Sequence, residues 1–374
     1  MRGMRSRRGY GMVIGIVTAA GCLAAALTGV LGLGAAAGAV STDAVRAIPA
    51  AGNPTGNVDV PAAGRAVDTR HPTRVIGHGT PASCTSAAVV KAVAAGGIIT
   101  FNCGPKPVTI TMTAAAKVVN TSHEVVLDGG GKVTLNGAGK TRILYMNTCD
   151  PKQKYTTSDC WEQQWPLLVV QNLTFKNAYS AVRQTATSNY GGGAIFDEGG
   201  QLKVVNSVFT GDRCYASGPD LGGGAVRAVG MYMGAVVYIT HDTFSGNSCS
   251  NGAALSGLYA RFGVFNSLFT NNKAIGWGAN PASSGTPGGG SGGAIYTDGN
   301  HYSLIIAGTA MTGNSAREGG GAIFFVVNAG GGQLKIKYSK LTKNPSGEFQ
   351  NAPGIFDSVD GADTQPVVVH STIS

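Results

Sequence analysis

The sequence has few charged and few aromatic residues. Only 13% of its 374 residues are Asp, Glu, Lys or Arg, and 7% are Phe, Trp or Tyr. The formal charge of +9 comes mostly from the N-terminal end. From residue 80 onward there are 20 Lys and Arg against 16 Asp and Glu, a net of +4. Because this charge is weak and scattered, no nucleic-acid partner is expected.

Two further absences exclude other classes. No Cys-x-x-Cys pair occurs, which makes a zinc site unlikely, and no Gly-x-y period occurs, which excludes collagen despite 58 glycines. After the N-terminal segment, no apolar run is long enough to span a bilayer, so no membrane association is expected once that segment is cleaved. Abundant Gly beside Val, Ile, Thr and Asn indicates short strands joined by tight turns.

Residues 1–39 read as a signal peptide, with a basic start, an apolar run over 12–33 and small residues at 35–39. The protein is therefore predicted to be secreted, either extracellular or on the cell surface. Three alternatives stay open: a twin-arginine signal at 6–10, a lipoprotein modified at Cys22, and an uncleaved anchor.

The remaining chain divides into a linker and one domain. Residues 40–79 are rich in Ala, Gly, Pro and Thr without apolar periodicity, which predicts a disordered linker. A single domain is predicted over 80–374. A short helix over 87–95, N-capped by Thr85 or Ser86 and ended by two glycines, is expected to cover its first strand edges.

Six cysteines lie outside the signal segment, an even number that predicts disulfides in an exported chain. They allow fifteen pairings. The pairing that joins neighbouring segments is favoured: Cys84–Cys103, Cys149–Cys160 and Cys214–Cys249.

A short glycine-led strand recurs about every thirty residues, which is the signature of a solenoid. Its inner apolar residue is expected to be Ile195, Val226, Leu255, Ile295, Ile323 and Ile355. A second repeated strand alternates apolar and mixed positions, which is typical of rungs of a parallel sheet. Its copies align on Phe175, Phe209, Phe244, Phe269, Met311, Leu341 and Ile373.

Three residues after that aligned position, most copies carry Asn or Asp: Asp212, Asn247, Asn272, Asn314 and Asn344. An Asn side chain tolerates tight turns and can hydrogen-bond to its stacked equivalent. These residues are predicted to brace the turns rather than to bind a ligand.

The Gly-Gly-Ala-Ile and Phe-x-x-Asn signatures together resemble the repeats of polymorphic outer-membrane proteins and related adhesins. The block Ser83-Cys84-Thr85, with the strand over 98–101 and the segment over 126–130, is similar to the opening of secreted proteins of the pectin-lyase-like superfamily. In this region a strand over 125–127 is expected to end at a turn over 128–131. The resemblance implies an all-β fold, a single-stranded right-handed parallel β-helix of about nine or ten coils. That fold hosts lyases, hydrolases, binders and adhesins alike, and the clustered Asp and Arg motifs of pectate lyases are missing.

If the Ile of each repeat points inward, the preceding Ala and the following residue must point outward. The following residues are Phe196, Arg227, Ser256, Tyr296, Phe324 and Phe356. Such an aromatic ladder with one cation is a candidate face for sugars, because rings stack on sugars and Arg grips a carboxylate. The alternative is that these rings stack on one another or lie under the long loops.

Candidate catalytic groups are few. Asp197 and Glu198 lie beside Arg227, and Asp298 is a further candidate for ligand binding. Lyase chemistry needs a base and a charge-stabilising cation, and glycosidase chemistry needs two carboxylates. An exposed turn at Asp197-Glu198 is the alternative.

The expected partner is an extracellular polysaccharide or cell-envelope glycan. The protein is expected to bind it, and cleavage by a lyase-like or hydrolase-like reaction stays open. The runner-up is a non-enzymatic, adhesin-like surface protein. No cofactor is expected; a calcium loop at Asp357, Asp360 and Asp363 is possible, although their spacing matches no calcium motif.

Overall fold

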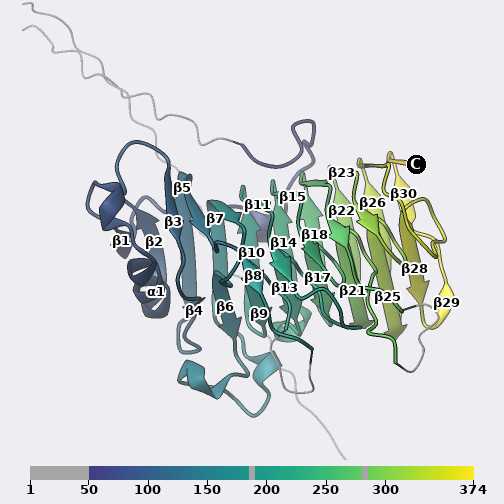
Figure 1. Cartoon of the computed structure of the whole chain (residues 1–374), viewed down its shortest axis with the longest axis horizontal. Helices are drawn as coiled ribbons and strands as arrows, with labels where there is room; N and C mark the ends of the chain where they lie inside the picture. The colour runs from purple at the N-terminus through teal and green to yellow at the C-terminus, as the bar shows by residue number, and fades with distance from the viewer. Residues whose placement is uncertain (1–49, 185–189, 280–284) are drawn as a thin grey trace, which may run out of the picture. The chain divides into compact units, whose positions relative to one another are not determined.

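The computed structural model describes residues 50–184, 190–279 and 285–374. The predicted signal segment over 1–39 lies outside the described residues. Ala47–Ser374 forms one compact unit, and all of the described strands belong to it. These strands stack beside one another from α1 (Ser86–Ala95) at one end to β30 (Val367–Val369) at the other (Figure 1).

The largest sheet, sheet 1, has 17 described strands in two rows, and its strands pair in parallel. The first row contains β1 (Arg74–Ile76), β2 (Gly97–Phe101), β5 (Glu124–Asn136), β7 (Leu167–Lys176), β10 (Gln201–Val205), β14 (Val236–Thr240), β18 (Arg261–Phe265), β22 (Leu304–Ala307), β26 (Leu334–Lys337) and β30. The second row contains β3 (Val108–Thr111), parts of β5 and β7, β11 (Val208–Thr210), β15 (Thr243–Ser245), β19 (Leu268–Thr270), β23 (Ala310–Thr312), β27 (Lys340–Thr342) and β31 (Thr372–Ile373).

Two smaller sheets complete each coil. Sheet 2 contains β4 (Ala116–Lys117), β6 (Leu144–Asn147), β9 (Ile195–Glu198), β13 (Val226–Val229), β17 (Leu255–Leu258), β21 (Ile295–Asn300), β25 (Ile323–Ala329) and β28 (Ile355–Val359), with β29 (Ala362–Asp363) antiparallel at its edge. Sheet 3 contains β8 (Tyr179–Ser180), β12 (Arg213–Cys214), β16 (Ser248–Cys249), β20 (Lys273–Ala274) and β24 (Ser315–Ala316). Short 3-10 helices span Ala62–Gly64, Pro81–Ser83, Pro151–Gln153, Cys160–Glu162 and Tyr232–Gly234. The fold is a parallel β-helix.

The core follows the register that the repeats predict. Phe209 pairs with Phe175 below it and with Phe244 above it, and all three are buried. The rings from Phe175 to Phe269 stack with centroids 4.8 Å apart at each step. Met311, Leu341 and Ile373 continue the same row. Each rung therefore buries its apolar residue against the one above, as parallel sheets require.

Each copy of the second repeat is bent, whereas the sequence suggested one continuous strand. The bend falls on a left-handed residue between the two rows of sheet 1, for example Asn206 at φ 47° and Asn266 at φ 50°. Asn accepts this conformation more readily than most residues because its short side chain can hydrogen-bond locally. The reverse holds at Asp128–Gly131, where a turn was expected: these residues form an irregularity within the continuous strand β5.

The predicted brace of turn side chains is confirmed. The Asn272 amide nitrogen donates to Asn314 Oδ1 at 2.8 Å, and Asn247 donates to Asn272 Oδ1 at 2.9 Å. The Asn314 amide likewise donates to Asn344 at 2.9 Å. These side chains are buried, so the ladder satisfies polar groups that would otherwise be costly inside the coil.

The helical cap and the disulfides also agree with the sequence. Helix α1 is N-capped by Thr85, whose hydroxyl accepts from the Ala88 amide, and ends at Gly96 with φ 70°. The three disulfides are Cys84–Cys103, Cys149–Cys160 and Cys214–Cys249.

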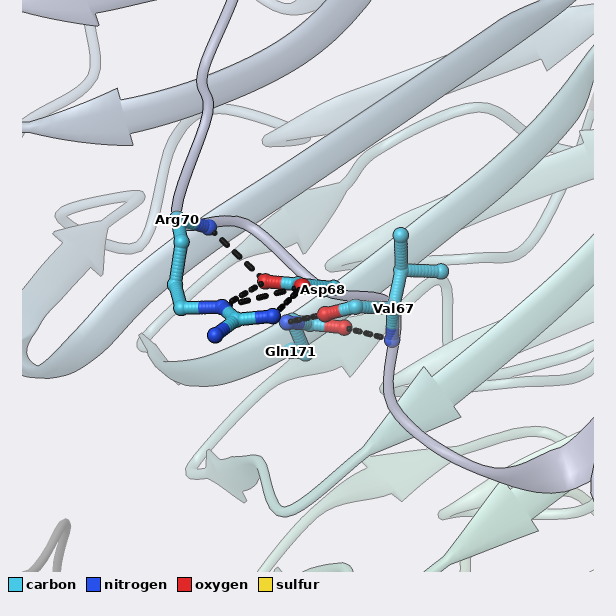
Figure 2. Close-up of polar contacts among 4 residues, drawn as sticks. All are labelled: Val67, Asp68, Arg70 and Gln171. Carbon is cyan, nitrogen blue, oxygen red and sulfur yellow. Dashed lines mark hydrogen bonds and ion pairs between the residues drawn. The ribbon is translucent and has the colours of Figure 1, made fainter. Parts of the chain in front are cut away.

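Residues 50–73, which we call the strap, differ from the predicted disordered linker. The strap lies along the bends of sheet 1 and hydrogen-bonds to them at several levels. Gln171 holds the Val67 backbone on both its N–H and its C=O, next to the Asp68–Arg70 ion pair within the strap (Figure 2). Composition suggested a linker because the strap has no apolar periodicity; hydrogen bonds to its backbone, which composition does not reveal, hold it in place.

Candidate functional site

Sheet 2 carries the predicted ladder on its outward face. Phe196, Arg227, Ser256, Tyr296, Phe324 and Phe356 occupy one register position, and Tyr145 extends it by one rung. The Ile row pairs in the same way and lies in the core. The direction of the Ile and of the following residue is thus confirmed. The Ala before the Ile was also expected to point outward, and this prediction is wrong. Ala194 and its equivalents pack in the core.

The ladder rings are largely covered rather than displayed. Tyr145, Phe196 and Tyr296 are buried, whereas Phe324 and Phe356 are half-buried. Tyr296 stacks on Phe324 at 5.0 Å, and Phe324 stacks on Phe356 at 5.2 Å. These three rings contact one another, which was the alternative expectation. The accessible part of this face includes Phe324 and Phe356 in part, together with two cavities.

The main cavity lies beside Phe196 and Arg227, which are neighbours in the ladder. It has a volume of about 600 Å³, and Phe196 and Arg227 contribute to its lining. The residues at its rim include Asp150, Lys152, Trp161, Tyr190, Glu198 and Tyr259. A cavity of this size with aromatic walls and a few polar groups has the usual character of a small-ligand site.

Arg227 is 1% exposed, and its guanidinium lies 5.0 Å from the centre of the Tyr190 ring. Its Nη1 donates to Ser256 Oγ at 2.9 Å, and its Nε has no hydrogen-bond partner within the described chain. No carboxylate pairs with it among the described residues. A buried cation without a counter-ion favours an anionic group nearby.

Glu198 follows Phe196 by two residues on β9 and therefore faces outward as well. Its carboxylate accepts from Asn147 Nδ2 at 2.7 Å and from Trp161 Nε1 at 3.0 Å. Trp161 and Tyr259 are 41% and 48% exposed, and their rings stack with centroids 6.2 Å apart. Glu198 thus orients one ring of an exposed aromatic pair at the rim.

Asp197 does not belong to this face. It points into the coil, in register with Met146 and Ala228, and is 0% exposed. Neither carboxylate oxygen has a partner in the described structure, and burial, reinforced by Glu198, raises the pKa of Asp197 well above its usual range. The expected exposed turn is wrong as well, because β9 continues to Glu198 and strand alternation sends adjacent side chains to opposite sides.

Asp298 lies on the same outward face, farther along sheet 2. Its carboxylate accepts from Tyr296 Oη at 3.2 Å and from Asn328 Nδ2 at 2.6 Å. Burial raises the pKa of Asp298. A second cavity of about 420 Å³ is lined by Asp220, Tyr296, Asp298 and Phe324, among others. The structure thus separates the predicted residues: Phe196, Glu198 and Arg227 share one cavity, Asp298, Tyr296 and Phe324 share another, and Phe356 lines neither.

The residues that sequence reasoning missed come from loops. Trp161 lies in the 3-10 helix Cys160–Glu162, directly after the Cys149–Cys160 disulfide. No sequence pattern pointed to Tyr190 and Tyr259 as site residues, because neither occupies a repeat position.

The possible calcium loop at Asp357, Asp360 and Asp363 stays an untested expectation. Asp357 points inward and accepts from Thr364 Oγ1 at 2.6 Å. Over the described ranges, no group of three or more His, Cys, Asp or Glu is placed to hold a metal ion. Among the same residues, no helix has the length and apolarity needed to cross a membrane.

One family comparison gives a match. Residues 266–298 match the Chlamydia polymorphic membrane protein repeat. The matched segment includes β19 and β20, begins just before the Phe269–Asn272 signature and ends just after Ile295 of the glycine-led strand. No curated protein and no solved structure gives a significant match. The chain therefore carries at least one repeat of this kind within a parallel β-helix.

Proposed function

We propose that this protein is a surface β-helix protein that binds a glycan in the main cavity of sheet 2. The observation that carries the proposal is the combination, in one cavity of about 600 Å³, of exposed aromatic rings with a buried Arg227 that has no carboxylate partner among the described residues. Surface location is proposed from the matched membrane-protein repeat and from three disulfides, which are typical of oxidising compartments.

The chemistry of the cavity favours a sugar carrying a carboxylate. Trp161 and Tyr259 offer ring faces on which the apolar face of a sugar can stack. Arg227 Nε is a buried donor without a partner, and a carboxylate is the group that satisfies a guanidinium best. Uronate-containing glycans are therefore the proposed ligands.

Binding is tested with uronate-containing and neutral oligosaccharides by titration calorimetry. Trp161→Ala and Tyr259→Ala are each expected to weaken binding by about 2- to 12-fold, since an aromatic contact contributes about 0.5–1.5 kcal/mol. Tyr338→Ala is the matched control, because Tyr338 is an exposed ring that lines neither the main nor the second cavity. Absence of binding, or equal weakening by the control, contradicts the proposal.

Cleavage of the glycan is the second candidate, favoured by the presence of Glu198 and Arg227 in the same cavity. A lyase reaction would use a base beside a cation that stabilises the developing charge. The assay is the ultraviolet absorbance of an unsaturated sugar product, with reducing-end release as the measure of hydrolysis. Glu198→Gln should abolish either signal while retaining binding.

If glycans bind and no product forms, the protein is a binder. If deletion of the chain changes cell adhesion while the purified protein binds no glycan, the adhesin-like alternative is favoured.

A further inference from the structure

The bends between the two rows of sheet 1 form a column that runs along the stacked coils. Left-handed residues mark its levels: Asn172, Asn206, His241, Asn266, Gly308, Tyr338 and His370. The strap follows this column from Gly308 back to Asp128 and reaches β2 through Thr73. Column and strap lie away from the cavities of sheet 2, so this site is independent of the proposed function.

Two amide side chains of sheet 1 grip the strap backbone in the same way. Asn266 Oδ1 accepts from the Val58 N–H at 3.0 Å, and Asn266 Nδ2 donates to the Val58 carbonyl at 2.8 Å. Gln171 repeats the arrangement at Val67, with 2.9 Å to the N–H and 3.0 Å to the carbonyl (Figure 2). Each clamp copies the hydrogen-bond pair that a neighbouring strand would make.

Further contacts also involve the strap backbone. The Ala51 N–H donates to Asn206 Oδ1 at 2.7 Å, and the Gly52 N–H donates to Thr243 Oγ1 at 2.8 Å. The Thr240 hydroxyl donates to the Gly64 carbonyl at 2.9 Å. Contacts of this kind recognise a peptide through its backbone.

Sequence selectivity comes from glycines at points of close approach. A Cβ on Gly56 would lie 2.4 Å from the Gly308 carbonyl oxygen, and one on Gly64 would lie 2.8 Å from the Tyr238 ring. A Cβ on Gly52 would lie 2.5 Å from the Asn266 carbonyl oxygen. Between residues 50 and 73, all of which are described, Gly52 and Gly64 are the only buried residues. The strap therefore has no buried apolar anchor.

We propose that the column is a binding site for a glycine-containing peptide, and that the strap is the ligand that occupies it. The ligand class is defined by backbone clamps at two levels and by glycines at positions equivalent to 52, 56 and 64. Recognition uses the peptide backbone, these glycines and the side chains of Asn53 and Thr69. All of these belong to the strap sequence, so the site should accept the same sequence from a separate molecule.

The test separates the strap from the coil while keeping the full chain. A protease recognition sequence is inserted after His71, which is exposed, and the purified chain is cut. The cut protein is incubated with an excess of a fluorescent peptide of residues 50–71 and then separated from free peptide by gel filtration. Label should elute with the protein. The uncut protein should retain at least about tenfold less label, because its tethered strap competes at high effective concentration.

Two changes and one control probe the recognition. A Gly56→Ala peptide should bind at least about tenfold more weakly, because its methyl group meets backbone that cannot yield. Gly56 has no positive φ, so the change leaves the peptide backbone unstrained. An Asp59→Ala peptide is the matched control, since Asp59 is exposed. In the protein, Asn266→Asp removes the donor to Val58 and should weaken binding about fivefold.

Circular dichroism of the cut protein shows that the coil remains folded, so that a negative result is interpretable. Retention of the wild-type and Asp59→Ala peptides, with loss of the Gly56→Ala peptide, supports the site. A folded cut protein that retains no label overturns the proposal. So does equal retention of the Gly56→Ala peptide, which would show that the glycines select nothing.

Discussion

Removal of the buried Asp197 carboxyl group should stabilise the protein. The group points into the coil at a level where its register neighbours are Met146 and Ala228, and both its oxygens lack partners within the described structure. Parallel coils normally fill such positions with apolar side chains. Asp197→Ala removes the unpaired group, and Asp197→Asn removes only its charge at nearly constant shape.

The size of the effect follows from two opposing contributions. An unsatisfied buried polar group costs about 1–3 kcal/mol. The space that the carboxyl group leaves costs about 1 kcal/mol or less, from the usual dependence on cavity volume. The free energy of unfolding of Asp197→Ala should therefore exceed that of the wild type by about 1–2 kcal/mol near neutral pH.

The pH dependence separates the charge from the packing. Burial raises the folded-state pKa of Asp197 above its unfolded value. Between those two pKa values the folded state binds more protons, so wild-type stability falls as pH rises from about 4. Neither variant has this dependence, and the advantage of each over the wild type should grow with pH in that window.

Urea denaturation followed by circular dichroism, at a series of pH values, measures these differences. A wild-type pH profile that both variants share would show that Asp197 is not a buried, destabilising acid. A loss of stability in Asp197→Asn at every pH would show that the carboxylate has a partner that stabilises it.

Three further predictions concern the coil, each measured as the free energy of unfolding. Asn272→Ala should lower it by at least about 2 kcal/mol, because Asn247 and Asn314 lose buried partners; an effect as small as that of the half-buried Thr270→Ala would contradict the brace. Phe244→Ala should lower it by about 3–5 kcal/mol through loss of a ring stacked on both sides, and Phe244→Leu should cost less. Replacing Cys214 and Cys249 by Ser should lower it by about 3–4 kcal/mol for a sequence separation of 35, and a reducing agent should then have no effect at that site.

The repeat positions were predictable because each rung repeats the same packing problem. Phe209 and Phe244 lie three residues before Asp212 and Asn247, respectively, and the structure pairs the two rings accordingly. The disulfides could be chosen among fifteen pairings because each joins cysteines that are neighbours along the chain, at separations of 19, 11 and 35 residues. The periodicity of the sequence therefore predicted both the register of the strands and the pairing of the cysteines.

The surface of the coil was less predictable. The aromatic ladder has the expected direction, yet loops with no repeat cover Phe196 and Tyr296 and supply Tyr190 and Tyr259 to the cavity. The strap has the composition of a linker, and its contacts with bend residues such as Asn266 and strand residues such as Gln171 hold it.

The sequence by itself thus determined the solenoid, its inward row and its covalent links, since these depend on spacing along the chain and on strand alternation. Only the tertiary structure decided which outward groups reach solvent, on which side of β9 Asp197 lies, and where residues 50–73 run. The physical reason is that apolar burial leaves a period in the sequence. Loop cover and hydrogen bonds to a backbone join residues far apart in the chain and leave no period to read.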